Sequence, residues 1–366
     1  MMEKTFGNES PSLKFLSLGA GAIGTYLGGS LILAGFNVVF LEQSAMKTEL
    51  EKRGLRLDLS IDRRRGRKTP SFVRPMAFQV ADTIEAALRL GPFDAGLFAL
   101  KSFDTADILE KLAPFKKDLP PFLCLSNGVD NEPALAAALG EDKVIAGTVT
   151  TSISRRAAGD ITLEKLRGIG ISAGHPISES LHEAFNSAYL NSQIYKDPAS
   201  MKWSKMLTNL IANPTSAILD MTPAQIFTHN GLYHMEIEMM RECLSVMKVK
   251  GLRIIDLPRT PVRALAFATR LPVWLSKPLM VRAAGAGRGS KMPSFHIDLH
   301  SGRGKSEVEH LHGAVVRAGE NFGIATPINK VLTEVLMDLT AGNIPVDQFA
   351  RKPEKLIEKI NQASRN

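Results

Sequence analysis

Short apolar runs alternate with amphipathic stretches in the first half of the chain. Residues 14–18 form an apolar run that ends at a glycine, which is typical of a buried parallel strand. A helical pattern extends from the following glycines to Ala34, and residues 38–41 predict a second strand. Further strands are predicted at 77–80, 95–100, 121–126, 144–146, 161–164, 169–171 and 189–194, and helices at 81–90, 105–112 and 132–139. Such alternation predicts a doubly wound α/β sheet.

Helical patterns replace the strand signals after residue 197. They cover residues 199–219, 232–250, 306–322 and 329–340, and Gly251, Gly323 and Gly342 stand where helices would end. The chain is therefore predicted to have two domains. Residues 13–197 form the α/β domain, and residues 198–366 form a helical domain that completes the site.

Composition places the 366-residue chain among globular proteins, with 44% hydrophobic and 22% charged residues. No apolar run approaches the ~20 residues that cross a bilayer, and residues 1–12 lack the apolar stretch of a secretory signal. The two cysteines, Cys124 and Cys243, have no metal-ligand spacing. These features favour a reducing, cytoplasmic location and no membrane partner.

The net charge is +8. Basic residues are not interleaved with aromatic ones, which argues against a nucleic-acid partner. The basic run at 63–68 is interpreted as a solvated loop between strands. A positive surface would still attract dinucleotides and small carboxylates.

A glycine-rich turn follows the first predicted strand, with the sequence Gly19-Ala-Gly21-Ala22-Ile23-Gly24. In the dinucleotide-binding fingerprint, the first glycine permits the turn, the second lets a pyrophosphate approach, and the third allows close helix packing. The helix N-terminus favours the negative charge of the pyrophosphate. The motif predicts a Rossmann domain that binds NAD or NADP, with a ligand-free turn as the alternative.

Glu42 ends the second predicted strand, where an acid can bind the ribose hydroxyls of a dinucleotide. A carboxylate there repels the 2′-phosphate of NADP and favours NAD. Neutral Gln43 and nearby Lys47 leave the choice of cofactor open, and Glu42 could instead be an ordinary exposed acid.

Lys205, Asn209 and Asn213 are spaced i, i+4 and i+8, which places them on one face of the predicted helix. Asparagine is unfavourable inside a helix, so two of them beside a lysine indicate a polar site. A positioned ammonium can stabilise a developing alkoxide and protonate it, as a ketone reductase requires. The alternatives are a polar interdomain contact or an exposed lysine.

Ser294 and Glu307 are weaker candidates from the residues alone. Ser294 could bind a substrate carboxylate, and Glu307 could orient the substrate or the lysine. Ser306 and Glu309 have the spacing of a capping box, which is the structural alternative.

Four histidines lie close together in this part of the sequence: His296, His300, His310 and His312. Their spacing makes no convincing metal site with nearby acids, and they are interpreted as surface or capping residues. No metal is predicted.

The order of motifs resembles the ketopantoate reductase (2-dehydropantoate 2-reductase) family from about residue 13 to 339. The matching segments are GAGAIG at 19–24, ALKSFDT at 99–105, SNGVDNE at 126–132, GTVTTSISRRAAGDI at 147–161, WSKMLTNLIANPTSAI at 203–218, SEVEHLHG at 306–313 and GIATPINKVL at 323–332. The resemblance implies a Rossmann domain and an all-α domain similar to that of 6-phosphogluconate dehydrogenase, with the active site in the cleft. The implied reaction is reduction of 2-dehydropantoate to pantoate with NADPH, in pantothenate biosynthesis.

The resemblance also implies roles for single residues. Lys205 matches the catalytic lysine, and Glu307 matches the glutamate that contacts the substrate hydroxyl. Five further matches concern the substrate and cofactor: Asn209 and Asn213 in the substrate site, Ser294 near the substrate carboxylate, Asn127 between cofactor and substrate, and Lys101 at the cofactor site.

Three departures from the family pattern leave alternatives open. Glu42-Gln43 stands where an arginine often binds the 2′-phosphate, and Ile297 replaces a common polar residue. Residues 258–292 form a long, apolar, arginine-rich stretch, interpreted as a helical lid or oligomer contact, with a membrane-surface role as the minor alternative. Helical second domains of this kind often dimerise, which makes a homodimer one possible assembly, but no residue in the sequence specifies it.

Two other functions compete with the reductase. One is an NAD-dependent dehydrogenase for a different keto or hydroxy acid. The other is a dinucleotide sensor without turnover, which the combination of Lys205, Asn209 and Glu307 disfavours.

Overall fold

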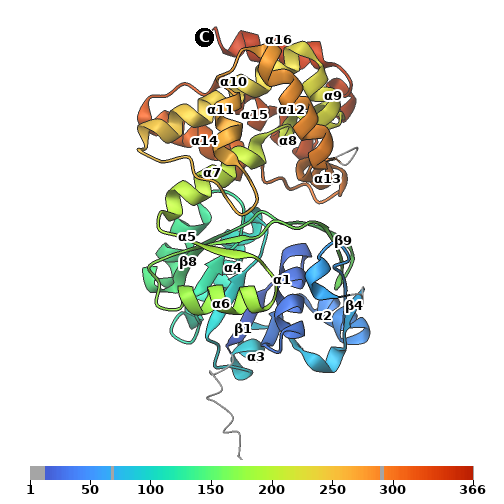
Figure 1. The fold of residues 1–366 in the computed structure, drawn as a ribbon, viewed down its shortest axis with the longest axis vertical. Helices are drawn as coiled ribbons and strands as arrows, with labels where there is room; N and C mark the ends of the chain where they lie inside the picture. The colour runs from blue at the N-terminus through green and yellow to red at the C-terminus, as the bar shows by residue number, and fades with distance from the viewer. Residues whose placement is uncertain (1–12, 67–69, 289–291, 366) are drawn as a thin grey trace, which may run out of the picture. The chain divides into compact units, whose positions relative to one another are not determined.

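The computed structural model describes residues 13–66, 70–288 and 292–365, which divide into two compact units (Figure 1). The first unit contains the described residues up to Leu100, Thr105–Ser126 and Ala134–Lys196. The second unit contains Lys101–Asp104, Asn127–Pro133 and the described residues from Asp197 onwards. Two short segments from the first half of the chain therefore belong to the second unit.

The described part of the first unit is built on an eight-stranded sheet with the order β12-β11-β8-β7-β6-β1-β2-β5. Its strands are β1 (Lys14–Leu18), β2 (Asn37–Leu41), β5 (Gln79–Ala81), β6 (Ala95–Phe98), β7 (Phe122–Cys124), β8 (Val144–Val149), β11 (Ile169–Ser172) and β12 (Ser192–Tyr195). Neighbours are parallel except β8 and β11. The strand order reverses beside β1, as in a Rossmann sheet, which confirms the predicted doubly wound α/β domain.

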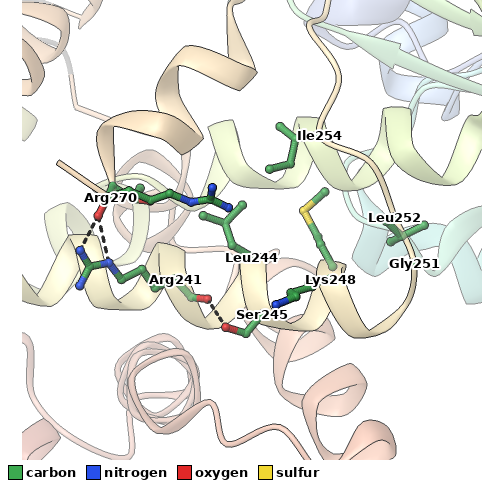
Figure 2. Close-up of a pocket in the computed structure, with 10 residues that line it drawn as sticks. Arg241, Leu244, Ser245, Lys248, Gly251, Leu252, Ile254 and Arg270 are labelled. Carbon is green, nitrogen blue, oxygen red and sulfur yellow. Dashed lines mark hydrogen bonds between the residues drawn. The ribbon is translucent and has the colours of Figure 1, made fainter.

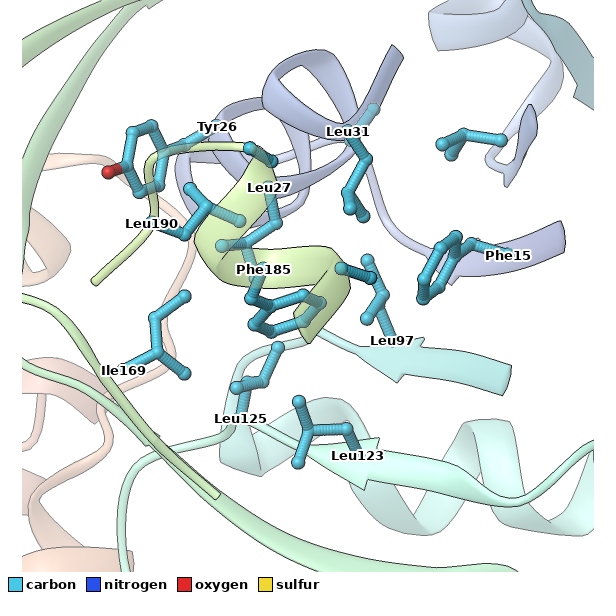
Figure 3. Close-up of a cluster of buried hydrophobic side chains, with 14 of the residues drawn as sticks. Phe15, Tyr26, Leu27, Leu31, Leu97, Leu123, Leu125, Ile169, Phe185 and Leu190 are labelled. Carbon is cyan, nitrogen blue, oxygen red and sulfur yellow. The ribbon is translucent and has the colours of Figure 1, made fainter. Parts of the chain in front are cut away.

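Alternate residues of the central strands enter two hydrophobic cores, because side chains point to opposite faces of a strand. Phe15, Leu97 and Leu123 join α1 (Ala22–Leu33) and α6 (Ser178–Ser187) on one face (Figure 3). Leu16 and Phe98 point to the other face. That second core also contains residues from α3 (Ile84–Arg89), α4 (Thr105–Leu112) and α5 (Asn131–Leu139). Apolar residues on both faces explain why these strands could be recognised as continuous hydrophobic runs.

A second sheet, with the order β4-β3-β10-β9, was not predicted. It consists of β3 (Leu55–Asp58), β4 (Ser71–Val73), β9 (Ser152–Ala157) and β10 (Asp160–Lys165), and α2 (Ser44–Arg53) precedes β3. Only β10 was expected as a strand. The parallel pairing of β3 with β10 joins residues about a hundred positions apart, which no local pattern indicates.

The basic run between β3 and β4 differs from the predicted solvated loop. Arg63–Arg65 form a short 3-10 helix, and Asp62 accepts hydrogen bonds from both Arg64 and Arg65. Arg64 also donates to the carbonyl of Tyr189 and Arg65 to that of Ala188. The Arg65 side chain is 7% exposed, so its guanidinium is not solvated and its ion pair holds the loop in place. Positions 67 and 68 lie outside the described residues.

The described part of the second unit is helical from Asp197 onwards, as predicted (Figure 1). Its helices are α7 (Pro198–Leu210), α8 (Asn213–Leu219), α9 (Pro223–Thr228), α10 (Asn230–Val249), α11 (Val262–Ala268), α12 (Val273–Arg288), α13 (Ser294–His300), α14 (Val308–Phe322), α15 (Pro327–Ala341) and α16 (Pro353–Ala363). Within the described ranges, no helix is long and apolar enough to span a membrane. The predicted 258–292 stretch contains α11 and α12.

The single helix predicted over residues 199–219 is wrong, because the chain breaks between α7 and α8. Ala212 adopts a left-handed conformation with φ of 52°. The buried Glu236 carboxylate accepts hydrogen bonds from the Ala212 amide at 2.8 Å and the Thr215 hydroxyl at 2.5 Å. Pro214 carried the sequence signal for this break, since proline cannot continue a helix from the preceding turn.

Only some of the helix ends predicted for this unit are observed in the structure. Gly323 and Gly342 end α14 and α15 in the left-handed conformation, as predicted. The predicted capping box is wrong, because Glu307 is the N-cap residue and makes no side-chain capping bond. Ser306 instead accepts a hydrogen bond from the Val308 amide at 3.2 Å.

Candidate active site

The glycine-rich loop of the first unit has the local geometry that its fingerprint predicts. Gly19 follows β1 with φ of 91°, and a Cβ on Gly24 would lie 1.9 Å from the Gly19 carbonyl oxygen. Gly21 is the N-cap of α1, and a Cβ there would meet no atom within 4 Å. Gly19 and Gly24 are therefore required by the turn itself, while Gly21, followed by Ala22 and Ile23, leaves open space at the helix N-terminus.

Glu42 is bound to this loop. The Ala20 amide donates to one of its carboxylate oxygens, and the Gln43 amide donates to the other at 3.2 Å. Lys47 instead pairs with Asp82 at 3.5 Å. The carboxylate is thus fixed next to the glycine-rich loop and is no ordinary solvated acid at a strand end.

Lys205 and Asn209 lie on one face of α7, as their spacing predicts. The Lys205 ammonium donates to Asn209 Oδ1 at 2.9 Å. Asn209 Nδ2 in turn donates to Asn127 Oδ1 at 3.0 Å, although the two residues are 82 positions apart. The structure therefore brings Asn127 into one hydrogen-bonded chain with the lysine and the asparagine.

Asn213 is not on the same helix, because it begins α8. Its side chain nevertheless reaches back, since Nδ2 donates to the Asn209 carbonyl at 3.1 Å. Asn213 Oδ1 accepts from the Phe295 amide at 3.1 Å, and Ser294 Oγ lies 3.4 Å from Asn213 Nδ2. The prediction of one helical face is corrected for Asn213, but Asn209, Asn213 and Ser294 are connected.

Lys101 joins two carboxylates. Its ammonium lies 2.8 Å from Glu307 Oε2 and 3.0 Å from Asp298 Oδ2. The Glu307 side chain is 1% exposed, and its second oxygen accepts from the Ser102 amide at 3.2 Å and lies 3.2 Å from the Ser102 hydroxyl. Lys101 and Glu307, which were predicted for different parts of the site, therefore form one ion-paired cluster.

Burial and charge act against each other in this cluster. Burial alone would raise the pKa of Glu307, but Lys101 and the Ser102 donors lower it below its ordinary value. Desolvation would lower the pKa of Lys101, yet the two carboxylates raise it. Burial raises the pKa of Asp298, with Lys101 opposing it. Lys101 and Glu307 are thus held charged, whereas burial makes Asp298 easier to protonate than an ordinary aspartate.

Three further residues belong to this network and had no predicted role: Ser102, Asn131 and Asp298. The Ser102 hydroxyl donates to the Asn127 carbonyl at 2.7 Å, and Asn131 Nδ2 donates to the same carbonyl at 2.6 Å. Asp298 is four positions after Ser294, on the same face of α13, and that spacing was the signal available in the sequence.

A separate pocket of about 850 Å³ lies along α10 (Figure 2). Arg241, Leu244, Lys248 and Arg270 are among its lining residues. The Arg241 guanidinium is already bound to the Thr269 carbonyl. No sequence-predicted site residue lines this pocket, so it is distinct from the candidate active site.

Comparison with known proteins covers most of the chain. The family model described as Ketopantoate reductase PanE/ApbA matches residues 15–174, and Ketopantoate reductase PanE/ApbA C terminal matches residues 197–340. The 2-dehydropantoate 2-reductase of Archaeoglobus fulgidus is 25% identical over 329 residues, which are 89% of this chain and 97% of that protein.

Solved structures show the same fold at lower identity. A PanE/ApbA family ketopantoate reductase from Ralstonia eutropha has a TM-score of 0.73 at 23% identity, covering 90% of this chain and 99% of that chain. The ternary structure of D-mandelate dehydrogenase with NADH and anilino(oxo)acetate has a TM-score of 0.70 at 18% identity, covering 90% and 100%.

The Rossmann sheet with its glycine-rich loop, followed by the helical unit, defines the class: an NAD(P)-dependent oxidoreductase. Matches to both family models, in the expected order, make the assignment more specific. The chain belongs to the ketopantoate reductase family.

Proposed function

We propose that this protein reduces 2-dehydropantoate to pantoate, with NADPH or NADH as hydride donor and Lys205 as general acid. The observation that carries the proposal is the hydrogen-bonded chain from Lys205 through Asn209 to Asn127. This chain supports the proposal because it holds the Lys205 ammonium in one direction, beside amide groups that can bind a polar substrate. In this proposal residues 13–197 bind the cofactor, and residues 198–366 supply substrate binding and catalysis.

The residues of the first unit fit a dinucleotide. The open space at Gly21 and the N-terminus of α1 suit a pyrophosphate, which would meet backbone N–H groups there. Glu42 is held by the loop amide with its carboxylate available to ribose hydroxyls. The reduced nicotinamide, when bound, supplies the hydride.

Lys205 has the role of proton donor. As a C–H bond forms at the keto carbon, the carbonyl π bond breaks and its electron pair moves to oxygen. The Lys205 ammonium stabilises that oxygen and transfers one proton to it, so the product gains two hydrogens and the lysine becomes a neutral amine. The amine regains a proton from solvent, and Asn209 holds Nζ in place throughout.

The remaining candidates bind the substrate. Asn213 and Ser294 face each other between α8 and α13 and present amide and hydroxyl groups suited to a carboxylate. Glu307 has spare lone pairs for a substrate hydroxyl beside its bonds to Lys101 and Ser102. Lys101 holds Glu307 in place through their ion pair.

Glu42 favours a second candidate, an NAD-dependent dehydrogenase for another keto or hydroxy acid. A carboxylate fixed at the loop would repel the 2′-phosphate of NADP. Parallel assays with NADPH and NADH, and with 2-dehydropantoate and a panel of other 2-keto acids, separate this candidate from the first.

The proposal is tested by comparing Lys205→Ala with Lys248→Ala, a matched control at an exposed position on α10 of the same unit. Oxidation of the reduced nicotinamide gives kcat, and fluorescence titration gives the cofactor Kd. Lys205→Ala should lower kcat by roughly 10²–10⁴-fold without changing the Kd, and Lys248→Ala should change neither. Unchanged kcat in Lys205→Ala would remove the lysine from the mechanism, and cofactor binding without any turnover would favour the sensor.

A further inference from the structure

Two histidines stand side by side on α13 at positions i and i+4. The ring centroids of His296 and His300 are 4.2 Å apart, as expected for side chains on one helical face. Paired imidazoles at this spacing are a recurrent metal-binding arrangement, because both nitrogens can point to one place.

A carboxylate completes the group from a different helix. Asp220 follows α8 in a left-handed conformation, with φ and ψ both 48°, and its Oδ1 lies 3.0 Å from His296 Nε2. One ligand atom from each of Asp220, His296 and His300 lies within 4.8 Å of the others. All three residues belong to the second unit.

The three ligand atoms lie close enough together to surround one small tetrahedral ion. Zinc bonds of about 2.0–2.2 Å place neighbouring ligand atoms roughly 3.3–3.6 Å apart in a tetrahedron. The 3.0 Å contact is already near this value, and the other ligand atoms, which lie within 4.8 Å of one another, would move closer when an ion binds. Asp220 is 44% exposed and His300 is exposed, so the fourth position opens to water.

We propose that Asp220, His296 and His300 form a binding site for one divalent transition-metal ion of the zinc class. Two imidazole nitrogens and one carboxylate oxygen suit Zn²⁺, Co²⁺ or Ni²⁺, whereas Mg²⁺ and Ca²⁺ require mainly oxygen ligands. Arg351 lies 3.6 Å from Asp220 Oδ2, on the oxygen that does not face His296. Oδ1 therefore remains directed towards the histidines.

The ion would fasten α13 to the C-terminal end of α8. The other end of α8 already holds α13, because Asn213 accepts a hydrogen bond from the Phe295 amide. Helix α13 also contains Ser294 and Asp298, which contact Asn213 and Lys101. Metal at this site therefore acts as a structural clamp beside the candidate substrate residues and takes no part in the hydride step.

The test uses the full chain, stripped with chelator and titrated with Co²⁺ and then Zn²⁺. We expect one equivalent of Co²⁺ to give the intense visible absorption of a tetrahedral ion, and Zn²⁺ to displace it. His300→Ala and Asp220→Asn should each weaken binding by about tenfold or more. His234→Ala, at an exposed position on α10, is the control and should bind like the unchanged chain.

A second measurement keeps the test independent of folding and of activity. Zn²⁺ should slow amide hydrogen exchange in α13 of the unchanged chain and of His234→Ala, but not of His300→Ala. Absence of a saturable one-to-one complex, or equal binding by His300→Ala and the unchanged chain, would overturn the proposal. Neither outcome bears on reductase activity, which is assayed separately with and without chelator.

Discussion

His312 couples the stability of the second unit to pH. It lies on α14 with 0% of its surface exposed, and its Nδ1 is 2.9 Å from Asn329 Oδ1. Asn329 Nδ2 donates to the Met239 carbonyl and the Glu242 carboxylate, which fixes Oδ1 as the acceptor. Burial lowers the pKa of His312 from 6.5 to about 3, against a smaller opposing effect of the Asn329 hydrogen bond.

The sign and the magnitude follow from that pKa. The folded form stays neutral where the unfolded form gains a proton, so stability is fully present above pH 6.5 and is lost as pH falls towards 3. At pH 5, protonation of the unfolded state costs the fold about 2 kcal/mol, from 1.36 kcal/mol per pKa unit over roughly 1.5 units.

The assay is urea unfolding of the unchanged chain and His312→Asn at pH 7.5 and 5. Asparagine keeps an N–H donor near the Nδ1 position but does not titrate. Tryptophan fluorescence reports on the second unit alone, because both tryptophans, Trp203 and Trp274, lie there. Between the two pH values the unchanged chain should lose about 2 kcal/mol more than the variant. His234→Asn should behave like the unchanged chain, and equal losses in His312→Asn would refute the reasoning.

Three further sets of substitutions test separate parts of the account. Gly21→Ala should weaken cofactor binding with little change in Tm. Gly24→Ala, whose Cβ would meet the Gly19 carbonyl, should instead lower Tm. Calorimetry measures the Tm of each variant, and cofactor titration measures its Kd. Glu42→Gln should raise the Kd of NADH about tenfold and that of NADPH less, since a charge-assisted hydrogen bond is lost. Lys202→Met should cost about 3 kcal/mol in urea unfolding, because it leaves the Glu132 carboxylate, whose side chain is only 14% exposed, without its 2.7 Å partner, and adding Glu132→Leu should recover most of that loss.

The sequence predicted those elements whose signals are local. Strands β1, β6 and β7 carry apolar residues for both faces of the sheet, and α4 was predicted with its observed bounds. Strand β9 was missed because four of the six residues in its sequence, SISRRA, are polar and all of them are exposed or partly exposed. Its place in a sheet is set by pairing with β10, which tertiary context decides.

The candidate site was predicted as a set of residues, not as a set of contacts. The spacing of Lys205 and Asn209 correctly placed both residues on one helical face, where they form a hydrogen bond. This was possible because residues four positions apart in a helix are neighbours. The pairing of Lys101 with Asp298 and Glu307 spans 197 and 206 positions, and chain spacing carries no information at that range. Burial of His312 was missed for the same reason, since its neighbours Asn329 and Phe295 come from α15 and α13.

The most direct test of the central claim follows the hydride itself. The full chain is incubated with 2-dehydropantoate and NADH or NADPH carrying deuterium at the transferable position of the nicotinamide, and the product is analysed by mass spectrometry. The account predicts pantoate with one deuterium at C2, formed at rates that fall by orders of magnitude in Lys205→Ala. Pantoate without deuterium, or bound cofactor with no product, would contradict it.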